Sequence, residues 1–342
     1  MATSIKRRTI VGGGVGLMLV TALTAAAPSA WAQAKKELTP VTVRLAFNYN
    51  GHRSPYLLGV DKGFYAEEGL DVKVLEGKGV TSSMQLVASK QDTFAVVDPP
   101  SLMLGYAQGM PVRTVVQLYQ TSPNAVISWD SANITKPADL VGKTVATLQG
   151  DTTTTMLYAL LAKNGIEASK VRIVASDGGT RNQTFLNKRS EAITGFTNDS
   201  YLGLKSTADA PIRMFPYSQF GIDTMGDGVI AHVDTIKNGP QTLAGFVRAT
   251  LKSYQYALQH PEEAIASLKK VSPSIKPEVE LEKLKATAPL LVSADTKANG
   301  IGYSSKERWK AAQDLMLQYG GLTKGVDDVS IYFTNAFLPK AK

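Results

Sequence analysis

Residues 41–75 read VTVRLAFNYNGHRSPYLLGVDKGFYAEEGLDVKVL, and this stretch decides the fold class. Val41–Phe47 is rich in branched apolar residues that alternate with polar ones, which is typical of a strand. Pro55–Glu68 has a proline near its start and Gly69 after its end, the asymmetry of a helix. Asp71–Leu75 predicts a second strand. A strand, a helix and a strand in this order indicate parallel sheets covered by helices.

The alternation of strands and helices continues and divides the chain into two α/β lobes. Further strands are predicted at Thr93–Val97, Val112–Leu118, Ala125–Trp129, Lys143–Leu148, Val171–Ala175, Ala192–Phe196, Ile212–Phe215 and Val229–Val233. Helices are then predicted at Pro240–Gln259, Pro261–Val271, Pro277–Thr287 and Lys306–Tyr319. We expect residues 40–124 and 229–342 to form lobe one and residues 125–228 to form lobe two.

The first 32 residues predict a cleaved export signal. Lys6, Arg7 and Arg8 precede a stretch of small apolar residues, and Ala30-Trp31-Ala32 matches an A-x-A cleavage site. The general secretory route and the twin-arginine route both stay open. We therefore expect the mature chain to be a soluble periplasmic protein.

The composition excludes several function classes. The chain has no cysteine, which excludes disulfide scaffolds, cysteine nucleophiles and thiolate metal sites. Only three histidines are present, at scattered positions, which argues against a metal site and a catalytic triad. Cleavage of residues 1–32 removes three basic residues and no acid, lowering the formal net charge from +8 to +5. The remaining charges are interspersed, so nucleic acid is not expected as a partner. No cofactor and no metal are expected either.

Polar loops follow the predicted strands, at the strand ends where folds of this kind bind ligands. They offer hydroxyls, amides, a few cations and at least two carboxylates, which suits a small polar or zwitterionic organic molecule. Backbone amides at the helix starts near Ser82 and Thr152 would accept a negative end of such a ligand. Both an enzyme and a binding receptor stay compatible with this layout.

Ser54–Leu70, SPYLLGVDKGFYAEEGL, resembles the segment after the first strand of periplasmic substrate-binding proteins. The group is the one that binds nitrate, taurine, alkanesulfonates and thiamine pyrimidine precursors, also called NMT1/THI5-like. The resemblance continues through Leu140–Val145, Gly195–Asp199 and Tyr217–Pro261, and covers almost the whole mature chain. It implies a type II periplasmic binding fold with two crossovers and a ligand cleft between the lobes. It also implies a monomer that closes on its ligand and delivers it to the membrane permease of an ATP-driven (ABC) importer.

The resemblance places candidate ligand residues by position. The ligand loops of the family fall on Asn48, Tyr49, Ser54, Lys78, Asp98, Gln149, Asp151, Thr152, Asn198 and Asp199. To these we add Ser82, Tyr119 and Arg181. We expect Asp98 and Asp199 to orient ligand donors from the two lobes, and Tyr49 or Tyr119 to stack on the ligand.

The ligand preference follows from these two acids. Because Asp98 and Asp199 would repel a bare anion, a ligand with an amino or ring N–H group is favoured, as in a thiamine pyrimidine precursor or another heteroaromatic. Thr197 stands where binders of thiamine precursors carry an aromatic residue. A taurine or alkanesulfonate receptor and a sensor subunit are alternatives. From another class, a periplasmic hydrolase and a pyrimidine-synthase-like enzyme are disfavoured, the latter because the related synthase depends on cysteines.

Overall fold

The computed structural model describes residues 37–339 together with residues 1, 2, 9, 10 and 12. Apart from those five residues, the predicted export signal at positions 1–32 lies outside the described residues. Residues from Glu37 onward form one compact unit, and the following description concerns this unit. Within the described residues, no helix has the length and apolar character needed to cross a membrane.

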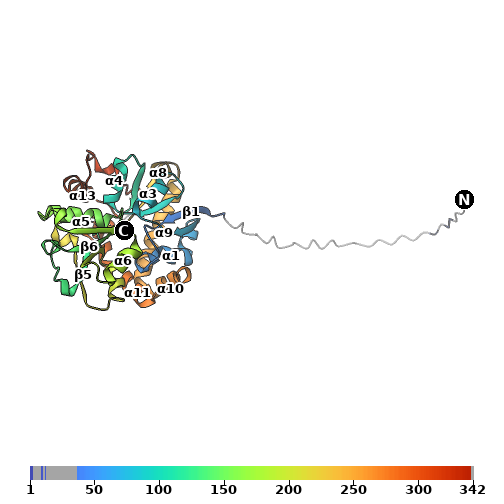
Figure 1. Ribbon diagram of the computed structural model, residues 1–342. Helices are drawn as coiled ribbons and strands as arrows, with labels where there is room; N and C mark the ends of the chain where they lie inside the picture. Colours follow the sequence, from blue (N-terminus) through green and yellow to red (C-terminus); the bar gives the residue numbers. More distant parts are fainter. Residues whose placement is uncertain (3–8, 11, 13–36, 340–342) are drawn as a thin grey trace. The chain divides into compact units, whose positions relative to one another are not determined.

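Two five-stranded sheets form the framework (Figure 1). The first sheet has the order β2-β1-β3-β10-β4 and the second has the order β7-β6-β8-β5-β9. In the first sheet the strands are β1 Thr39–Arg44, β2 Leu70–Leu75, β3 Phe94–Val97, β4 Val112–Val116 and β10 Gly228–His232. In the second they are β5 Asn124–Trp129, β6 Thr144–Leu148, β7 Arg172–Ser176, β8 Ala192–Phe196 and β9 Ile212–Pro216.

The prediction of an α/β fold with two crossovers is confirmed, and both sheets are mixed, whereas the alternation of strands and helices indicated parallel sheets. Strand β10 runs antiparallel to both β3 and β4, and β5 runs antiparallel to both β8 and β9. These are the two strands that the chain enters from the other sheet, through residues 117–123 and 217–227. Each begins at the edge where the parallel strands end, because Asn124 pairs with Phe196 and Gly228 pairs with Val97. Alternation of strands and helices carries no signal for this change of direction.

The helices follow the sequence pattern closely where prolines begin them. Helices α9 (Pro240–Gln259) and α10 (Pro261–Val271) have the predicted bounds. The predicted helix Pro55–Glu68 is instead two helices, α1 (Ser54–Asp61) and α2 (Phe64–Glu67), separated by Gly63 at φ +73°. The other helices are α3 Val80–Ala88, α4 Pro99–Ala107, α5 Thr152–Lys163, α6 Gly178–Leu186, α7 Ser200–Lys205, α8 Val233–Asn238, α11 Pro277–Lys285, α12 Ala294–Asn299 and α13 Lys306–Gln318.

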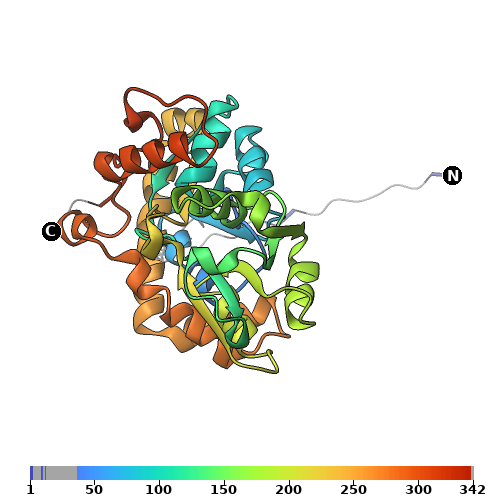
Figure 2. The same cartoon turned by 60° about the vertical axis from the view of Figure 1, so that its left-hand side comes forward.

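The helices that follow β10 pack in two places. Helices α9 and α10 lie against α1, whereas α13 lies beside α4 (Figures 1 and 2). Helix α11 contacts both the short helix η1 (Gly51–Arg53), which follows β1, and α7, which follows β8. It is therefore an element at which parts attached to the two sheets meet.

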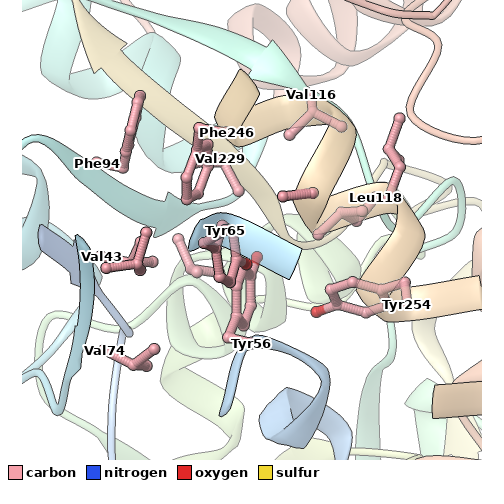
Figure 3. Packing of buried hydrophobic residues seen from close by; sticks show 14 of the residues in the cluster. Val43, Tyr56, Tyr65, Val74, Phe94, Val116, Leu118, Val229, Phe246 and Tyr254 are labelled. Atoms are coloured by element: carbon pink, nitrogen blue, oxygen red, sulfur yellow. The ribbon is translucent and has the colours of Figure 1, made fainter. Parts of the chain in front are cut away.

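Aromatic rings fill the core around the first sheet (Figure 3). The ring of Phe246, on α9, stacks on Phe94 with 4.0 Å between centroids and on Tyr65 with 5.6 Å. All three side chains are almost completely buried. A smaller core in the second sheet contains the stacked rings of Trp129 and Phe185.

We predict that Phe246→Ala lowers the free energy of unfolding by about 3–5 kcal/mol, because it leaves a cavity between two stacked rings. Urea unfolding followed by circular dichroism measures this loss. Leu317→Ala on α13 is the control, since Leu317 is 41% exposed and its truncation should change stability little. Equal losses in the two variants would contradict this account of the core.

Candidate functional site

A cleft of about 770 Å³ lies where the carboxyl ends of the parallel strands of both sheets meet. Its wall includes the segments that follow β1, β2, β6, β7 and β8. Loops at the carboxyl edge of an α/β sheet are the usual ligand-binding region of such folds. The lining residues are Phe47, Asn48, Asn50, Arg53, Gly77, Lys78, Leu148, Gln149, Asp151, Thr153, Ser176, Asp177, Gly178, Gly179, Arg181, Asn182, Gly195, Phe196, Asp199 and Ser200.

Some of the predicted site residues line this cleft and others do not. Those in the lining are Asn48, Lys78, Gln149, Asp151, Arg181 and Asp199. Those outside it are Tyr49, Ser54, Ser82, Asp98, Tyr119, Thr152 and Asn198. The second group is engaged in hydrogen bonds within the protein, described next.

Three of the hydroxyls outside the cleft hold nearby backbone. The Tyr49 hydroxyl donates to the carbonyl oxygen of Val74 at 2.8 Å. The hydroxyl of Ser54 donates to Gly51 at 2.7 Å, and that of Ser82 donates to Gly79 at 3.0 Å. In this structure these side chains fix the loops after β1 and β2 rather than face the cleft.

Tyr119 is completely buried against His52. Its hydroxyl lies 3.0 Å from Nδ1 of His52 and also donates to the His52 carbonyl oxygen at 3.3 Å. Burial, with the neighbouring charge of Arg53, lowers the pKa of His52 well below its ordinary value, so this imidazole is neutral. The edge of the His52 ring approaches Phe196, whose side chain lines the cleft.

Asp199 is held by a lysine from α11. The Nζ of Lys283 lies 3.0 Å from Oδ1 of Asp199 and 2.8 Å from Oε1 of Glu280. The other oxygen of Glu280 accepts the backbone N–H of Gly51 at 2.5 Å. Burial acts to raise the pKa of Asp199, but the ammonium of Lys283, which also hydrogen-bonds the carboxylate, and the charge of Arg53 outweigh it and hold the pKa at about 2. The carboxylate is therefore ionised, and its negative charge is balanced by the ammonium of Lys283.

Two arginines of the cleft are fixed by internal partners. Arg53 donates to Asp227 at 3.0 Å and is only 3% exposed, while its Nε has no partner among the described residues. Arg181 donates to the carbonyl oxygen of Thr194 at 2.9 Å and to the side chain of Asn182. Buried in the same way, Oδ1 of Asn50 and Nε2 of His52 lack a partner in the described part of the chain.

The other lining residues were not among the predicted site residues, and four of them bear on the chemistry of the cleft. Phe47, Asn50 and Arg53 lie on the segment after β1, and Phe196 is the last residue of β8. The signal for Phe47 and Phe196 was present, since each ends a predicted strand. The partners of Arg53 and Asn50 depend on distant segments, which no local pattern reveals.

Asp98 and Asp151 begin helices. Asp98 caps α4, where its carboxylate accepts the N–H of Ser101 at 2.9 Å and the hydroxyl of Thr152 at 2.7 Å. Asp151 caps α5 by accepting the N–H and the hydroxyl of Thr153, which satisfies one of the free amides of the first turn. Burial raises the pKa of Asp98 to about 6, although these hydrogen bonds act in the opposite direction.

Two α/β sheets joined by two crossovers around a cleft are the fold of periplasmic binding proteins. The alkanesulfonate-binding protein SsuA of Xanthomonas axonopodis pv. citri, solved bound to MOPS, matches with a TM-score of 0.67. The match is 15% identical and covers 87% of this chain and 99% of that one. The NMT1/THI5-like family model matches residues 50–264, so the chain belongs to that family.

Curated relatives carry names of both binding proteins and enzymes. The riboflavin-binding protein RibY of Chloroflexus aurantiacus is 26% identical over 98% of this chain and 99% of its own length. A formylaminopyrimidine-binding protein of Halalkalibacterium halodurans is 26% identical over 73% of this chain and 76% of its own. A 4-amino-5-hydroxymethyl-2-methylpyrimidine phosphate synthase of Legionella pneumophila is 23% identical over 87% of this chain and 92% of its own.

The raised pKa of Asp98 predicts a loss of stability as the pH rises. Because the folded pKa, about 6, exceeds the ordinary 3.8, the folded protein holds this proton more tightly than the unfolded chain. The resulting stabilisation is complete below about pH 4, lost as the pH passes 6, and amounts to at most about 3 kcal/mol.

The test compares the wild type with Asp98→Asn by chemical unfolding from pH 4 to 7. His52 acts in the opposite direction within this window, because its lowered pKa stabilises the fold as the pH rises. The difference between the two proteins removes that contribution. The free energy of unfolding of the wild type minus that of the variant should decrease as the pH rises from 4 to 7. A difference that stays constant over this range would contradict the raised pKa of Asp98.

Proposed function

We propose that this protein is the solute-binding receptor of an ABC importer, and that it captures a small heteroaromatic ligand by closing two lobes around it. Lobe one comprises residues 40–124 and 229–342, and lobe two comprises residues 125–228. The observation that carries the proposal is the composition of the cleft wall. Aromatic and hydrogen-bonding side chains approach the same space from both sheets.

The apolar part of the cleft suits a flat ring. Phe47 follows β1 of the first sheet, whereas Leu148 and Phe196 end strands β6 and β8 of the second. An aromatic ligand enclosed by such side chains gains both burial of apolar area and favourable ring contacts. Phe196, the residue directly before Thr197, supplies an aromatic group to the cleft wall, where Thr197 itself stands at the position at which binders of thiamine precursors carry an aromatic residue.

The charge of the cleft suits a neutral or zwitterionic ligand. The basic lining residues are Arg53, Lys78 and Arg181, and they are matched in number by the acids Asp151, Asp177 and Asp199. The unpartnered polar atoms of Asn50 and Arg53 add a hydrogen-bond acceptor and a donor in residues of the cleft wall. Buried polar groups of this kind favour a ligand whose edge supplies the missing partners. The names of the riboflavin- and formylaminopyrimidine-binding relatives support the same ligand class.

A taurine or alkanesulfonate receptor is the second candidate, favoured by Lys78. This side chain is exposed, lines the cleft and makes no ion pair with a described residue. The first turn of α6, with Gly178 and Gly179, lines the same cleft but is capped by the carboxylate of Asp177, so Lys78 is the group that would hold an anionic head.

A binding role rather than catalysis is proposed for the whole protein. His52, the histidine nearest the cleft, is fully buried and hydrogen-bonded to Tyr119. The described residues hold no group of metal-ligating side chains, and the sequence contains no cysteine nucleophile. We further propose that the protein is an exported periplasmic monomer that delivers its ligand to a membrane permease.

The experiment is calorimetric titration of the protein with riboflavin, a formylaminopyrimidine, taurine and an alkanesulfonate. We predict that one of the two heteroaromatic probes binds, and that Asp199→Ala weakens its binding at least tenfold. A loss of that size, about 1.4 kcal/mol, is within the range of one charge-assisted hydrogen bond. The variant should still fold, because Lys283 keeps Glu280 as a partner.

Asp209→Ala is the matched control, since Asp209 is exposed and pairs with Lys188 away from the cleft. Its affinity should equal that of the wild type. Binding of taurine or the alkanesulfonate alone would favour the second candidate. Conversion of any probe to a product would overturn the receptor proposal.

A further inference from the structure

The first turns of α4 and α5 meet through side chains. Helix α4 follows β3 of the first sheet, and α5 follows β6 of the second, so this contact joins the parts attached to different sheets. Asp98 caps α4, and Thr152 is the first residue of α5. Each is only 8% exposed.

Three side chains meet at this contact, and two of them are hydroxyls that share one carboxylate oxygen. The Thr152 hydroxyl donates to Oδ2 of Asp98 at 2.7 Å, and the Ser101 hydroxyl donates to the same oxygen at 3.0 Å. The two hydroxyl oxygens lie 2.6 Å apart. Oδ1 of Asp98 accepts the backbone N–H of Ser101 and keeps the carboxylate oriented.

The contact is part of the cleft's surroundings but faces away from the cleft. Asp151 lines both the cleft and a small neighbouring pocket of about 160 Å³, while Thr153 lines the cleft alone. Ser101 and Thr152 line the small pocket and not the cleft. The first turn of α5 therefore separates a ligand-facing side from the side on which Thr152 bonds to Asp98.

We propose that Asp98, Ser101 and Thr152 form a latch that holds the two lobes closed, so that they are positioning residues that act on ligand binding through closure. The inference rests on the proposed function, because a latch changes affinity only in a receptor that closes on its ligand. Separation of the lobes breaks the Thr152 bond but leaves Ser101 on Asp98, since both belong to the same helix turn. The latch thus favours the closed state specifically.

Other contacts join the same two parts through different elements. Lys283 pairs with Asp199, and the side chain of Asn198 donates to the hydroxyl of Thr287 at 3.0 Å. These contacts involve α11, the residues directly after it and the turn after β8, whereas the latch involves α4 and α5. Loss of the latch should therefore shift the closing equilibrium without unfolding the protein.

The decisive variant is Thr152→Val, which removes the donor while keeping the shape of the side chain and leaving the Asp98 cap of α4 in place. Thr155→Val is the matched control, because Thr155 lies on the same helix beside the same pocket and makes none of the latch hydrogen bonds. Circular dichroism and urea unfolding establish that both variants are folded.

The lobe separation is measured directly with spin labels. Because the chain lacks cysteine, labels attach only to introduced cysteines, here Lys73→Cys on β2 and Arg172→Cys on β7, both exposed. Double electron–electron resonance gives the distribution of distances between the two labels, with and without saturating riboflavin. Small-angle X-ray scattering gives the radius of gyration of the same samples. A formylaminopyrimidine replaces riboflavin if it is the probe that binds.

We expect Thr152→Val to shift the distances toward longer values, to increase the radius of gyration, and to weaken probe binding on the order of tenfold through faster dissociation. Thr155→Val should match the wild type. Unchanged distances in Thr152→Val, with or without the probe, would overturn the latch. Weaker binding without a change in distance would also overturn it, by showing that Thr152 contacts the ligand directly.

The same measurements separate this inference from the proposed function. If no probe binds the wild type, the ligand proposal fails, while the distances of the free protein still decide whether Thr152 holds the lobes together. Asp98→Asn should preserve the latch, because its side-chain N–H groups can donate to the two hydroxyls whose hydrogen bonds the carboxylate accepts in the wild type. Distances in Asp98→Asn closer to the wild type than those in Asp98→Ala are therefore expected.

Discussion

The site depends on one constraint of the chain path, namely that both crossovers run along the carboxyl edges of the sheets. Strand β4 ends at that edge, and residues 117–123 carry the chain to β5, which begins at the corresponding edge of the second sheet. Residues 217–227 return it to β10 in the same manner. The loops that follow the parallel strands of both sheets are thereby brought to face one cleft. The same path forces β5 and β10 to run antiparallel to their neighbours.

The sequence was informative wherever a feature is set by neighbouring residues. Prolines begin α9 and α10 at the expected positions, and Asp151 caps α5 as its place before a helix indicated. The antiparallel direction of β5 could not be predicted in this way, because it depends on the edge of the sheet at which the chain enters the strand. The break at Gly63 was also missed, since a single glycine within a helical pattern is compatible with a continuous helix.

Candidate residues were predicted best where position alone places them at the cleft. Asn48 and Gln149 are of this kind, because each follows a strand that the sequence predicts and each lines the cleft. Asp98 also follows a strand, yet its carboxylate accepts a hydrogen bond from Thr152 on α5, the helix that follows β6 of the other sheet. Lys283 approaches Asp199 from a helix far along the chain. Such partners depend on how the two sheets are placed, which is a tertiary property with no local pattern.

The polar groups beside the cleft are of two kinds, paired charges and buried atoms without a partner. The buried charges beside it have partners, since Arg53 bonds to Asp227 and Asp199 pairs with Lys283. Oδ1 of Asn50 and Nε of Arg53, in contrast, are buried without partners among the described residues, which is costly in a protein interior. Both residues line the cleft. Both atoms belong to the segment after β1, so a ligand edge that reached this one segment would recover that cost for both of them.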